Sequence, residues 1–428
     1  MSLNNPNMIK WAKDLYPYPR SLTGSGNRKT LRYIQKIIGK IKIVKFSSNK
    51  KVFDWTIPLE WEIKDAYIQH SSGQKFASFK KHNLHIVGYS HKINKNLKLS
   101  DLKNNIHYDP KNSDAIPYVT SYYKKNWGFC MSKNEINKMP KGNYRAFIDA
   151  EFKKGFLEIG EFFIKGKSKK EILFCCNICH PSMVNNELSG MVVMMALIKF
   201  IKKQHKNPYY SYKFLFLPET IGSIAYLSKY YKQLRQNVVA GYQLSCVGDE
   251  RSFSHISSRL GSTIADLSVI SAIKDKKNFK SYDFLSRGSD ERQFCSPGID
   301  LPFCGFSKTK YGKFPEYHTS KDDFNLVTQK GLLESYKVFQ SIINSFERGI
   351  YTIVQTLGEP FMSKYNLYPA ISKKDQYKNI DKIMNVLAYS DGLNNIFQIS
   401  LKCNISLNEI NSIISTLKDN NIIKLRYT

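Results

Sequence analysis

The sequence predicts an α/β fold in which a mainly parallel, mixed sheet carries helices on both faces. From about residue 143 onward, short apolar runs alternate with segments of helical periodicity. Residues 50–125 instead show short alternating runs between clusters of Asn, Gly, Pro and Lys, and residues 370–428 form a mostly helical tail. Apolar strands separated by helices are typical of parallel sheets buried between helical layers. We therefore expect one large α/β domain with two smaller additions.

The large domain is predicted to begin with two helices, at residues 8–15 and 26–39. Leu31 and Ile34 lie on the apolar face of the second helix, and the polar stretch 23–27 is expected to cap it. The remaining elements, in chain order, are a hairpin of strands 144–152 and 156–164, a strand at 171–178, a helix at 189–203, a strand at 212–217, a helix at 223–234, a strand at 238–245, and helices at 263–273 and 330–346.

The two additions are a β-rich insert and a C-terminal domain. The insert, residues 49–125, divides the large domain into the segments 1–48 and 126–358. The tail, 370–428, contains three short helices followed by one strand, which predicts a winged helix. These four elements are predicted at 380–387, 396–401, 407–420 and 422–425.

The third helix of the tail is a poor candidate for a DNA-reading helix. It carries Glu409 and, near its end, only Lys418, whereas a helix that reads DNA usually brings more positive charge. We therefore favour a protein contact or the formation of a homo-oligomer as the role of the tail, over binding of a nucleic-acid partner.

The formal net charge of +30 does not by itself indicate a nucleic-acid partner. Of the 65 basic residues 11 are Arg, which leaves 65 − 11 = 54 Lys, and Arg is the better reader of phosphate. A basic surface still favours anionic substrates. Eight scattered cysteines, no signal-peptide pattern and no apolar stretch of about 18 residues predict a cytoplasmic protein without membrane insertion.

Candidate catalytic side chains lie where predicted strands end. His180 follows the strand at 171–178, and Glu219 follows the strand at 212–217. Active sites of open α/β sheets lie beyond the carboxyl ends of the strands, so these two side chains are expected to lie close together.

Three further candidates lie in loops or at a helix start. Glu187 precedes the helix at 189–203, Asp290 lies in Ser-Asp-Glu-Arg-Gln, and His318 lies in a polar loop before the last long helix. Imidazole nitrogen and carboxylate oxygen are zinc ligands, and a catalytic zinc keeps one position open for water. The predicted zinc ligands are His180, Glu187, Asp290 and His318. For both imidazoles to bind one ion, their rings must lie within about 8 Å of each other.

The motifs around these residues resemble those of the co-catalytic zinc aminopeptidase superfamily, which includes glutamate carboxypeptidases and glutaminyl cyclases. The superfamily pattern is a strand-end His, Asp-Asn-x-Ser-Gly, Glu-Glu before Gly-Ser, Ser-Asp-x-x-x-Phe and Tyr-His-Thr-x-x-Asp. The chain matches this pattern at His180, Ser189-Gly190, Glu219 with Gly222-Ser223, Ser289-Asp290 with Phe294, and Tyr317-His318-Thr319 with Asp322. More narrowly, residues 20–24, 54–61, 179–182, 218–223 and 289–293 resemble bacterial aminopeptidase-like proteins of polysaccharide-biosynthesis clusters. Those proteins carry a β-rich insert and a C-terminal winged helix.

The resemblance implies a zinc-dependent hydrolase of an amide or peptide bond. Its substrate would be a small peptide, an aminoacyl compound or an acyl-amino sugar, and Glu219 would act as the general base or bind the metal. Arg20 and Arg287 are the candidates for binding a substrate carboxylate or phosphate. Three alternatives stay open: a catalytically degenerate scaffold, a winged-helix DNA-binding regulator, and an acyltransferase like the glutaminyl cyclases.

Three departures from the superfamily pattern affect how many zinc ions the site can bind. The bridging Asp falls on Asn186, the Glu-Glu pair is reduced to Pro218-Glu219, and the Asp two residues after the first His is Ser182. Glu187 is the candidate replacement for the bridging Asp. Because fewer carboxylates hold a second dication less strongly, we expect one well-occupied zinc and a second that is weak or absent.

Overall fold

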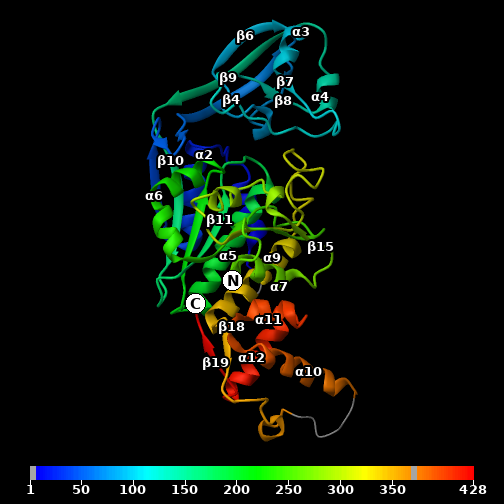
Figure 1. The fold of residues 1–428 in the computed structure, drawn as a ribbon. Helices are drawn as coiled ribbons and strands as arrows, with labels where there is room; N and C mark the ends of the chain where they lie inside the picture. Colours follow the sequence, from blue (N-terminus) through cyan, green and yellow to red (C-terminus); the bar gives the residue numbers. More distant parts are fainter. Residues whose placement is uncertain (1–5, 368–373) are drawn as a thin grey trace.

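The computed structural model describes residues 6–367 and 374–428. Figure 1 shows three parts along one long axis: the β-rich insert at the top, the α/β domain in the middle and the C-terminal helices and strands at the bottom. The α/β domain is therefore in contact with an addition at each end.

The large sheet has eight strands in the order β1-β10-β12-β11-β13-β16-β14-β15. Its central four strands, β12, β11, β13 and β16, run parallel, and antiparallel pairs join β1 to β10, β10 to β12 and β14 to β16. The strands are β1 (Lys42–Ser47), β10 (Phe156–Ile164), β11 (Glu171–Asn177), β12 (Ser211–Leu217), β13 (Val238–Leu244), β14 (Phe253–Ile256), β15 (Phe279–Tyr282) and β16 (Phe303–Ser307). The mainly parallel, mixed sheet predicted from the sequence is confirmed.

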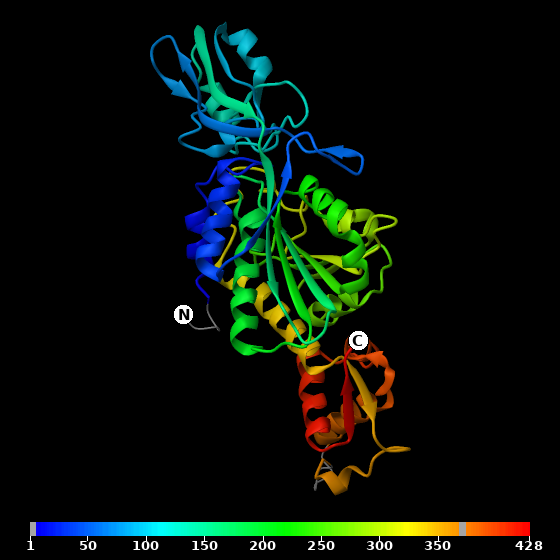
Figure 2. The same cartoon turned by 90° about the vertical axis from the view of Figure 1, so that its left-hand side faces the viewer.

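Helices cover both faces of this sheet, as the sequence predicts (Figure 2). One face carries α1 (Met8–Leu15), α2 (Ser25–Ile38), α5 (Ser189–Gln204), α7 (Ile264–Ile273) and α9 (Gln329–Arg348), and the other carries α6 (Ile221–Asn237) and α8 (Glu291–Phe294). Alternate residues of a strand point to opposite faces. Phe174 of β11 accordingly packs in the α9 layer, while its neighbours Leu173 and Cys175 pack in the α6 layer.

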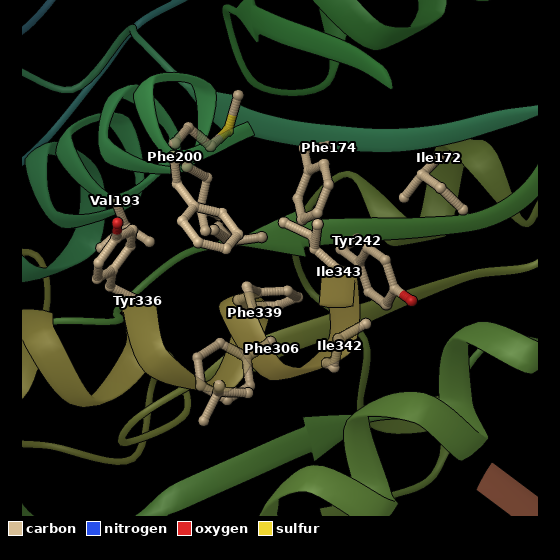
Figure 3. Packing of buried hydrophobic residues seen from close by; sticks show 14 of the residues in the cluster. Ile172, Phe174, Val193, Phe200, Tyr242, Phe306, Tyr336, Phe339, Ile342 and Ile343 are labelled. Carbon is tan, nitrogen blue, oxygen red and sulfur yellow. The ribbon is translucent and has the colours of Figure 1, made fainter. Parts of the chain in front are cut away.

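The core between the sheet and α9 is aromatic (Figure 3). The ring of Phe174 stacks on Phe214 with centroids 5.0 Å apart, and Phe339 of α9 lies 5.5 Å from Phe174 and 5.2 Å from Tyr242. Close packing of large rings makes this layer hard to deform. The carboxyl ends of β11 and β12 are therefore fixed points from which loop residues project.

Helix α5 is unusually apolar. Among the described residues, the stretch Val184–Gln204 alone has the length and composition that could cross a membrane, and 94% of its most apolar window is buried within the protein. Burial on all sides is the ordinary position of a fully apolar core helix.

The predicted hairpin of strands 144–152 and 156–164 is wrong. Strand β9 (Asn143–Lys153) pairs with β4 (Glu60–His70) and β6 (Ile93–Lys98) in the insert's sheet, whereas β10 belongs to the large sheet. Strand β4 offers β9 a long ladder and an apolar face that includes Ala66 and Ile68, both fully buried. Adjacency in the sequence therefore did not decide the pairing.

The insert contains a four-stranded antiparallel sheet, β5-β4-β9-β6, and several short elements. These are β2 (Lys51–Val52), β3 (Trp55–Thr56), β5 (Lys75–Phe76), α3 (Leu99–Leu102), β7 (Ile106–His107), β8 (Phe129–Cys130) and α4 (Lys133–Asn137). The predicted range 49–125 holds the insert's elements from β2 to β7, and β8, α4 and β9 follow it. Its boundaries stay a prediction.

Helix α2 is capped by the insert and not, as predicted, by the polar stretch 23–27. The first residue before the helix, Gly24, has φ +99° and no side chain to offer. Instead, Glu62 of β4 accepts hydrogen bonds from the backbone N–H and the hydroxyl of Ser25, at 2.5 and 2.7 Å. A carboxylate at this position also interacts favourably with the helix dipole.

The tail forms the predicted winged helix, with α10 (Lys374–Ala388), α11 (Ile396–Lys402), α12 (Leu407–Asp419) and β19 (Ile423–Arg426). Two strands that were not predicted, β17 (Tyr351–Val354) and β18 (Asp391–Asn395), complete its antiparallel sheet in the order β18-β17-β19. The third helix, α12, lies against α9: Ser341 donates to Asn408 at 2.7 Å, and Asn411 donates to Ser345 at 2.8 Å. Part of its polar face is therefore occupied within the chain.

Candidate metal centre

A cavity of about 490 Å³ opens at the carboxyl ends of β11 and β12. The loops after these strands contribute Cys179, His180, Glu219, Thr220 and Ile221, and the insert contributes Trp55, Tyr118, Thr120, Tyr122 and Tyr123. Leu22, Arg292 and His318 complete the lining. The insert therefore forms one wall of the site, and the prediction that His180 and Glu219 lie together is confirmed.

His180 is held at three points. Its Nδ1 contacts Glu187 Oε2 at 2.6 Å, its backbone N–H donates to Glu187 Oε1 at 2.8 Å, and its carbonyl accepts from Arg20 Nε at 3.1 Å. Burial alone would lower the pKa of His180, but the Cys179 sulfur and the Glu187 carboxylate around Nδ1 outweigh it and raise that pKa well above its usual range. With Nδ1 hydrogen-bonded to Glu187, Nε2 is the ring nitrogen left for a cation, which would displace the Nε2 proton. Glu219 Oε2 lies 3.6 Å from this Nε2.

Glu187 therefore orients the His180 ring. Both of its oxygens accept hydrogen bonds from His180, and its side chain is fully buried. A carboxylate on the second nitrogen of a metal-binding histidine fixes the tautomer and the ring direction. The superfamily has an Asp for this purpose two residues after the His, where this chain has Ser182, and Glu187 occupies that place from a π-helical turn at Val184–Leu188.

Glu219 projects from a strained turn. Thr220, the next residue, has φ +64° and ψ −73°, and the N–H of Ile221 donates to the carbonyl of Glu219 at 2.8 Å, which closes a γ-turn of the rare, strained kind. A β-branched residue at positive φ costs about 1–3 kcal/mol and tends to occur at functional sites. Burial raises the pKa of Glu219 above its usual value, although a quarter of its side chain, 24%, remains exposed.

Asp290 stabilises that turn from behind. Its Oδ1 accepts from the Thr220 N–H at 2.8 Å and from the Ser223 hydroxyl at 2.6 Å, and its Oδ2 accepts from Asn177 Nδ2 at 3.0 Å. Burial, followed by the charge of Glu219, raises the pKa of Asp290 to about 7. The two carboxyl groups thus lie close enough to influence each other's protonation.

His318 is positioned by the insert. Its carbonyl accepts from the N–H of Tyr118 at 2.8 Å, and a β-bridge joins Pro117 to Thr319. The Ser320 N–H donates to the Ile116 carbonyl at 2.9 Å, and the Ser320 hydroxyl accepts from the Ile116 N–H at 3.0 Å. We name this contact between residues 116–118 and 318–320 the insert clamp. It holds His318 in a left-handed conformation with φ +56°.

The two imidazole rings lie 5.2 Å apart between centroids, which confirms the prediction that they are closer than about 8 Å. The ring of His318 stacks on Tyr317 at 3.9 Å and meets Tyr118 edge-on at 5.3 Å. Burial and the neighbouring His180 lower the pKa of His318 to about 3, so its ring is neutral at pH 7. A neutral imidazole is the form that binds metal.

An unpaired buried imidazole nitrogen, His318 Nε2, fits a cation at this place. Among the described residues, His318 Nε2 and Asn186 Oδ1 are buried without a hydrogen-bond partner. Buried polar atoms without a hydrogen-bond partner are rare in native proteins, and a bound ion or water often explains them. Asn186, which stands where the superfamily has its bridging Asp, offers only a neutral amide oxygen, while Asp322 accepts its backbone N–H at 2.8 Å.

Two other clusters have ligand atoms close enough for a metal, but their contacts are those of hydrogen-bond networks. The group Cys179, His180 and Glu187 lies on the Nδ1 side of His180, and burial raises the pKa of the Cys179 thiol to about 12, so the sulfur stays protonated. In the group His255, Asp266 and Cys304, Asp266 already accepts from His255 at 2.9 Å and also caps helix α7. The Nε2 side of His180 is therefore the better candidate.

Comparisons with known proteins agree with the fold. A family model described as "Domain of unknown function (DUF4910)" matches residues 9–349, and a winged helix-turn-helix model matches residues 349–425. The chain belongs to the DUF4910 family. A Clostridium acetobutylicum relative, named as a polysaccharide biosynthesis protein with an aminopeptidase-like domain, is 38% identical over 96% of this chain and 95% of its own length.

Solved structures extend the comparison. A crystal structure of a protein described as a peptidase, also from Clostridium acetobutylicum, has 36% identity and a TM-score of 0.88, covering 98% of this chain and 96% of its own. A zinc aminopeptidase from Bacillus subtilis has 13% identity and a TM-score of 0.55, covering 78% of this chain and 94% of its own. The DUF4910 chain therefore has the fold of the zinc aminopeptidases.

The predicted substrate arginines lie outside the cavity lining. Arg287 is exposed, donates to the carbonyl of Phe284 at 3.2 Å and lies over its ring at 4.6 Å. Arg20 is buried behind His180, and burial lowers its pKa to about 10. The arginine that does line the cavity in this DUF4910 chain is Arg292, which was not among the candidates from the sequence.

The aromatic wall of the insert was also missed. Trp55 belongs to the segment 54–61, which carries part of the family resemblance, and Tyr118 lies in the predicted insert, but nothing in their spacing indicates contact with His180 or His318. The one signal that could have pointed to Arg292 is its position in the sequence, two residues after the candidate ligand Asp290.

Proposed function

We propose that this chain is a zinc-dependent hydrolase of an amide or peptide bond. The supporting observation is the convergence of two imidazoles beside Glu219, at the carboxyl edge of the sheet and inside a cavity walled by the insert. Two histidines, a carboxylate and an open position for water form a ligand set typical of catalytic zinc.

The ion would be held by the Nε2 atoms of His180 and His318, beside Glu219. Asp290 is not assigned as a ligand, because Thr220, Ser223 and Asn177 engage both of its oxygens. Glu187 receives a different role from the one predicted, because its two oxygens are engaged by His180. A single ion is favoured because Asn186 supplies a neutral oxygen where a bridging carboxylate would hold a second dication.

Glu219 is assigned as the general base. Zinc, when bound, supplies Lewis-acid polarisation of the scissile carbonyl and of the attacking water. Glu219 takes a proton from that water and later passes it to the leaving amine, and a carboxyl pKa raised by burial brings its proton affinity closer to that task. The strained turn at Thr220 and the hydrogen bonds of Asp290 fix where this carboxylate points.

The proposed substrate class follows from the fold and from the name of the relative. An aminopeptidase-like fold suits a small peptide or an aminoacyl compound, and a polysaccharide-biosynthesis relative suits an acyl-amino sugar. A reducing compartment such as the cytoplasm fits the eight free cysteines, of which seven are buried.

The DNA-binding alternative has less support. The polar residues Asn408 and Asn411 of α12 contact α9, so the helix that would read a duplex is partly occupied within the chain. We assign the winged helix a structural role beside α9.

The test measures turnover and zinc content together. L-leucine p-nitroanilide and N-acetylglucosamine are assayed with and without a chelator, for the wild type and for Glu219→Gln. The control is Glu250→Gln, which removes a surface carboxylate that pairs with Lys330. We expect a chelator-sensitive turnover that falls by about 10²–10⁴-fold in Glu219→Gln, with zinc retained.

Two results would count against these assignments. Turnover that survives both the chelator and the substitution would refute the proposal. Loss of zinc together with turnover would make Glu219 a ligand in place of the base.

A further inference from the structure

Arg292 is a cation of the cavity wall that interacts with Glu219 and Asp290 through its charge but forms no ion pair with either of them. Its Nη2 donates to the Thr220 hydroxyl at 2.6 Å, and its Nε is buried without a hydrogen-bond partner. Among residues 6–367 and 374–428, no carboxylate oxygen lies within 4.0 Å of its guanidinium nitrogens. It is also the one arginine or lysine among the described residues that line the cavity.

Other arginines of the chain show what is missing. Arg251 forms a two-pronged contact with Glu316 at 2.8 and 2.9 Å, Arg28 pairs with Glu60 at 2.7 Å, and Arg259 pairs with Asp300. A guanidinium presents five N–H groups in a planar fork that matches a carboxylate or a phosphate. The guanidinium of Arg292 lies in the cavity wall near Glu219, where the scissile bond would lie. Some of its N–H groups have no hydrogen-bond acceptor in the part of the chain that the structure describes.

We infer that Arg292 binds an anionic group of the substrate, a carboxylate or a phosphate. This inference rests on the proposed function for the scissile bond, and it narrows the substrate class to acylated amines that also carry a negative charge. A free amino group, which an aminopeptidase substrate presents, would be repelled by Arg292. The insert supplies the rest of the subsite: Trp55 and Tyr123 expose their rings at a centroid distance of 6.3 Å and offer apolar faces to the body of the ligand.

The test compares probes that share a phenylpropyl skeleton, differ in carrying a carboxylate or a neutral hydroxyl, and contain no amide bond to cleave. Binding of 3-phenylpropionate and of 3-phenylpropanol to the purified full chain is measured by isothermal titration calorimetry. A charge-assisted contact predicts that the acid binds about tenfold or more tightly than the alcohol. Phenyl phosphate forms the third arm: if it binds more tightly than the acid, the anion is a phosphate, and otherwise it is a carboxylate.

Variants locate the effect. Arg292→Gln is expected to abolish the preference for the acid, and Arg292→Lys, which keeps the charge but loses the fork, is expected to retain part of it. The matched control is Arg287→Gln, which removes an exposed arginine five residues earlier in the chain and is expected to behave as the wild type. Thermal unfolding of each variant shows that the fold is retained.

The inference is overturned if the wild type binds the acid and the alcohol equally, or if the preference survives in Arg292→Gln. Because these measurements need no turnover, they separate the inference from the proposed function. An acid preference lost in Arg292→Gln would support the anion subsite even in a protein that hydrolyses neither L-leucine p-nitroanilide nor N-acetylglucosamine, because neither compound carries the negative charge that Arg292 would bind. Turnover of an anionic acylated amine, N-acetyl-L-glutamate, would then test the hydrolase assignment separately.

Discussion

His180 and His318 face one cavity, but the fold holds them in opposite ways. His180 is fixed by the α/β domain itself, through both oxygens of Glu187 and the guanidinium of Arg20. His318 has an unpaired Nε2, and its backbone is held by the insert clamp. One half of the site is therefore complete within the sheet and its loops, while the other half depends on an added domain.

This difference explains why a β-rich insert accompanies the α/β domain. The insert places the main chain of Tyr118 against His318 and closes the cavity with aromatic rings. The difference also predicts that equivalent substitutions on the two sides have unequal effects.

The largest expected difference concerns stability without metal. In chelator-treated protein, His180→Ala leaves the buried Glu187 carboxylate uncompensated and is expected to lower the free energy of unfolding by about 3–5 kcal/mol. His318→Ala removes a ring whose Nε2 has no partner and is expected to lower it much less. Urea unfolding measures both values, and equal losses would break the comparison.

Zinc binding should respond more evenly. Both His180→Ala and His318→Ala are expected to weaken zinc binding by more than about 100-fold, because loss of an outer partner alone costs 10–100-fold. Competition with a chromogenic chelator gives the affinities. The control is His255→Ala, whose ring belongs to the network around Asp266; a comparable loss of zinc in that variant would place the ion elsewhere.

Glu187→Gln sharpens the comparison on the His180 side. The amide keeps an acceptor for His180 but removes the charge that fixes its ring, so zinc affinity is expected to fall by about 10–100-fold. If zinc affinity were unchanged, the orienting role of Glu187 would be wrong.

Ser320→Ala tests the clamp on the His318 side. The substitution removes the acceptor for the Ile116 N–H, a hydrogen bond worth about 1 kcal/mol, and is expected to weaken zinc binding by roughly fivefold. Ser100→Ala, at an exposed position of the insert, is the control. Equal zinc affinities in the two variants would show that the clamp does not position His318.

The smallest expected effect concerns His255 and Asp266, the pair that we exclude as a metal site, and it is an effect on stability at low pH. Burial alone would raise the pKa of Asp266, but hydrogen bonds from His255, Ser258 and Thr263 outweigh it and lower that pKa below 3.8. A carboxyl whose folded pKa is depressed contributes stability above about pH 4, and the contribution is lost as the pH falls through the folded pKa. Asp266→Asn should therefore be less stable than the wild type at pH 7, with a gap that narrows below pH 4 in urea unfolding, and its zinc content should be unchanged.

The sequence was sufficient for most of the fold because the elements carry local signals. Fully apolar runs such as β11 and β12, and the periodicity of α9, predicted the layers and their order. The rule that sites lie beyond the carboxyl ends of parallel strands then brought His180 and Glu219 together. The hairpin of β9 and β10 failed because strand partners are chosen by long-range burial, which no local pattern encodes.

The site was only partly predictable for the same reason. Motif spacing pointed to His180, Asp290 and His318, but the hydrogen-bond partners of Glu187 depend on a turn whose direction is set by tertiary packing. The choice of Arg292 over Arg287 depends on which way a short helix faces the cavity. The insert clamp joins segments about 200 residues apart, a contact that follows from the folded chain alone.

Anomalous scattering at the zinc absorption edge tests the central claim most directly. Crystals grown with zinc should show one strong peak within bonding distance of the Nε2 atoms of both His180 and His318, about 2.0–2.1 Å from each. A peak on the Nδ1 side of His180, between Cys179 and Glu187, or a peak that touches only one of the two rings, would contradict the account.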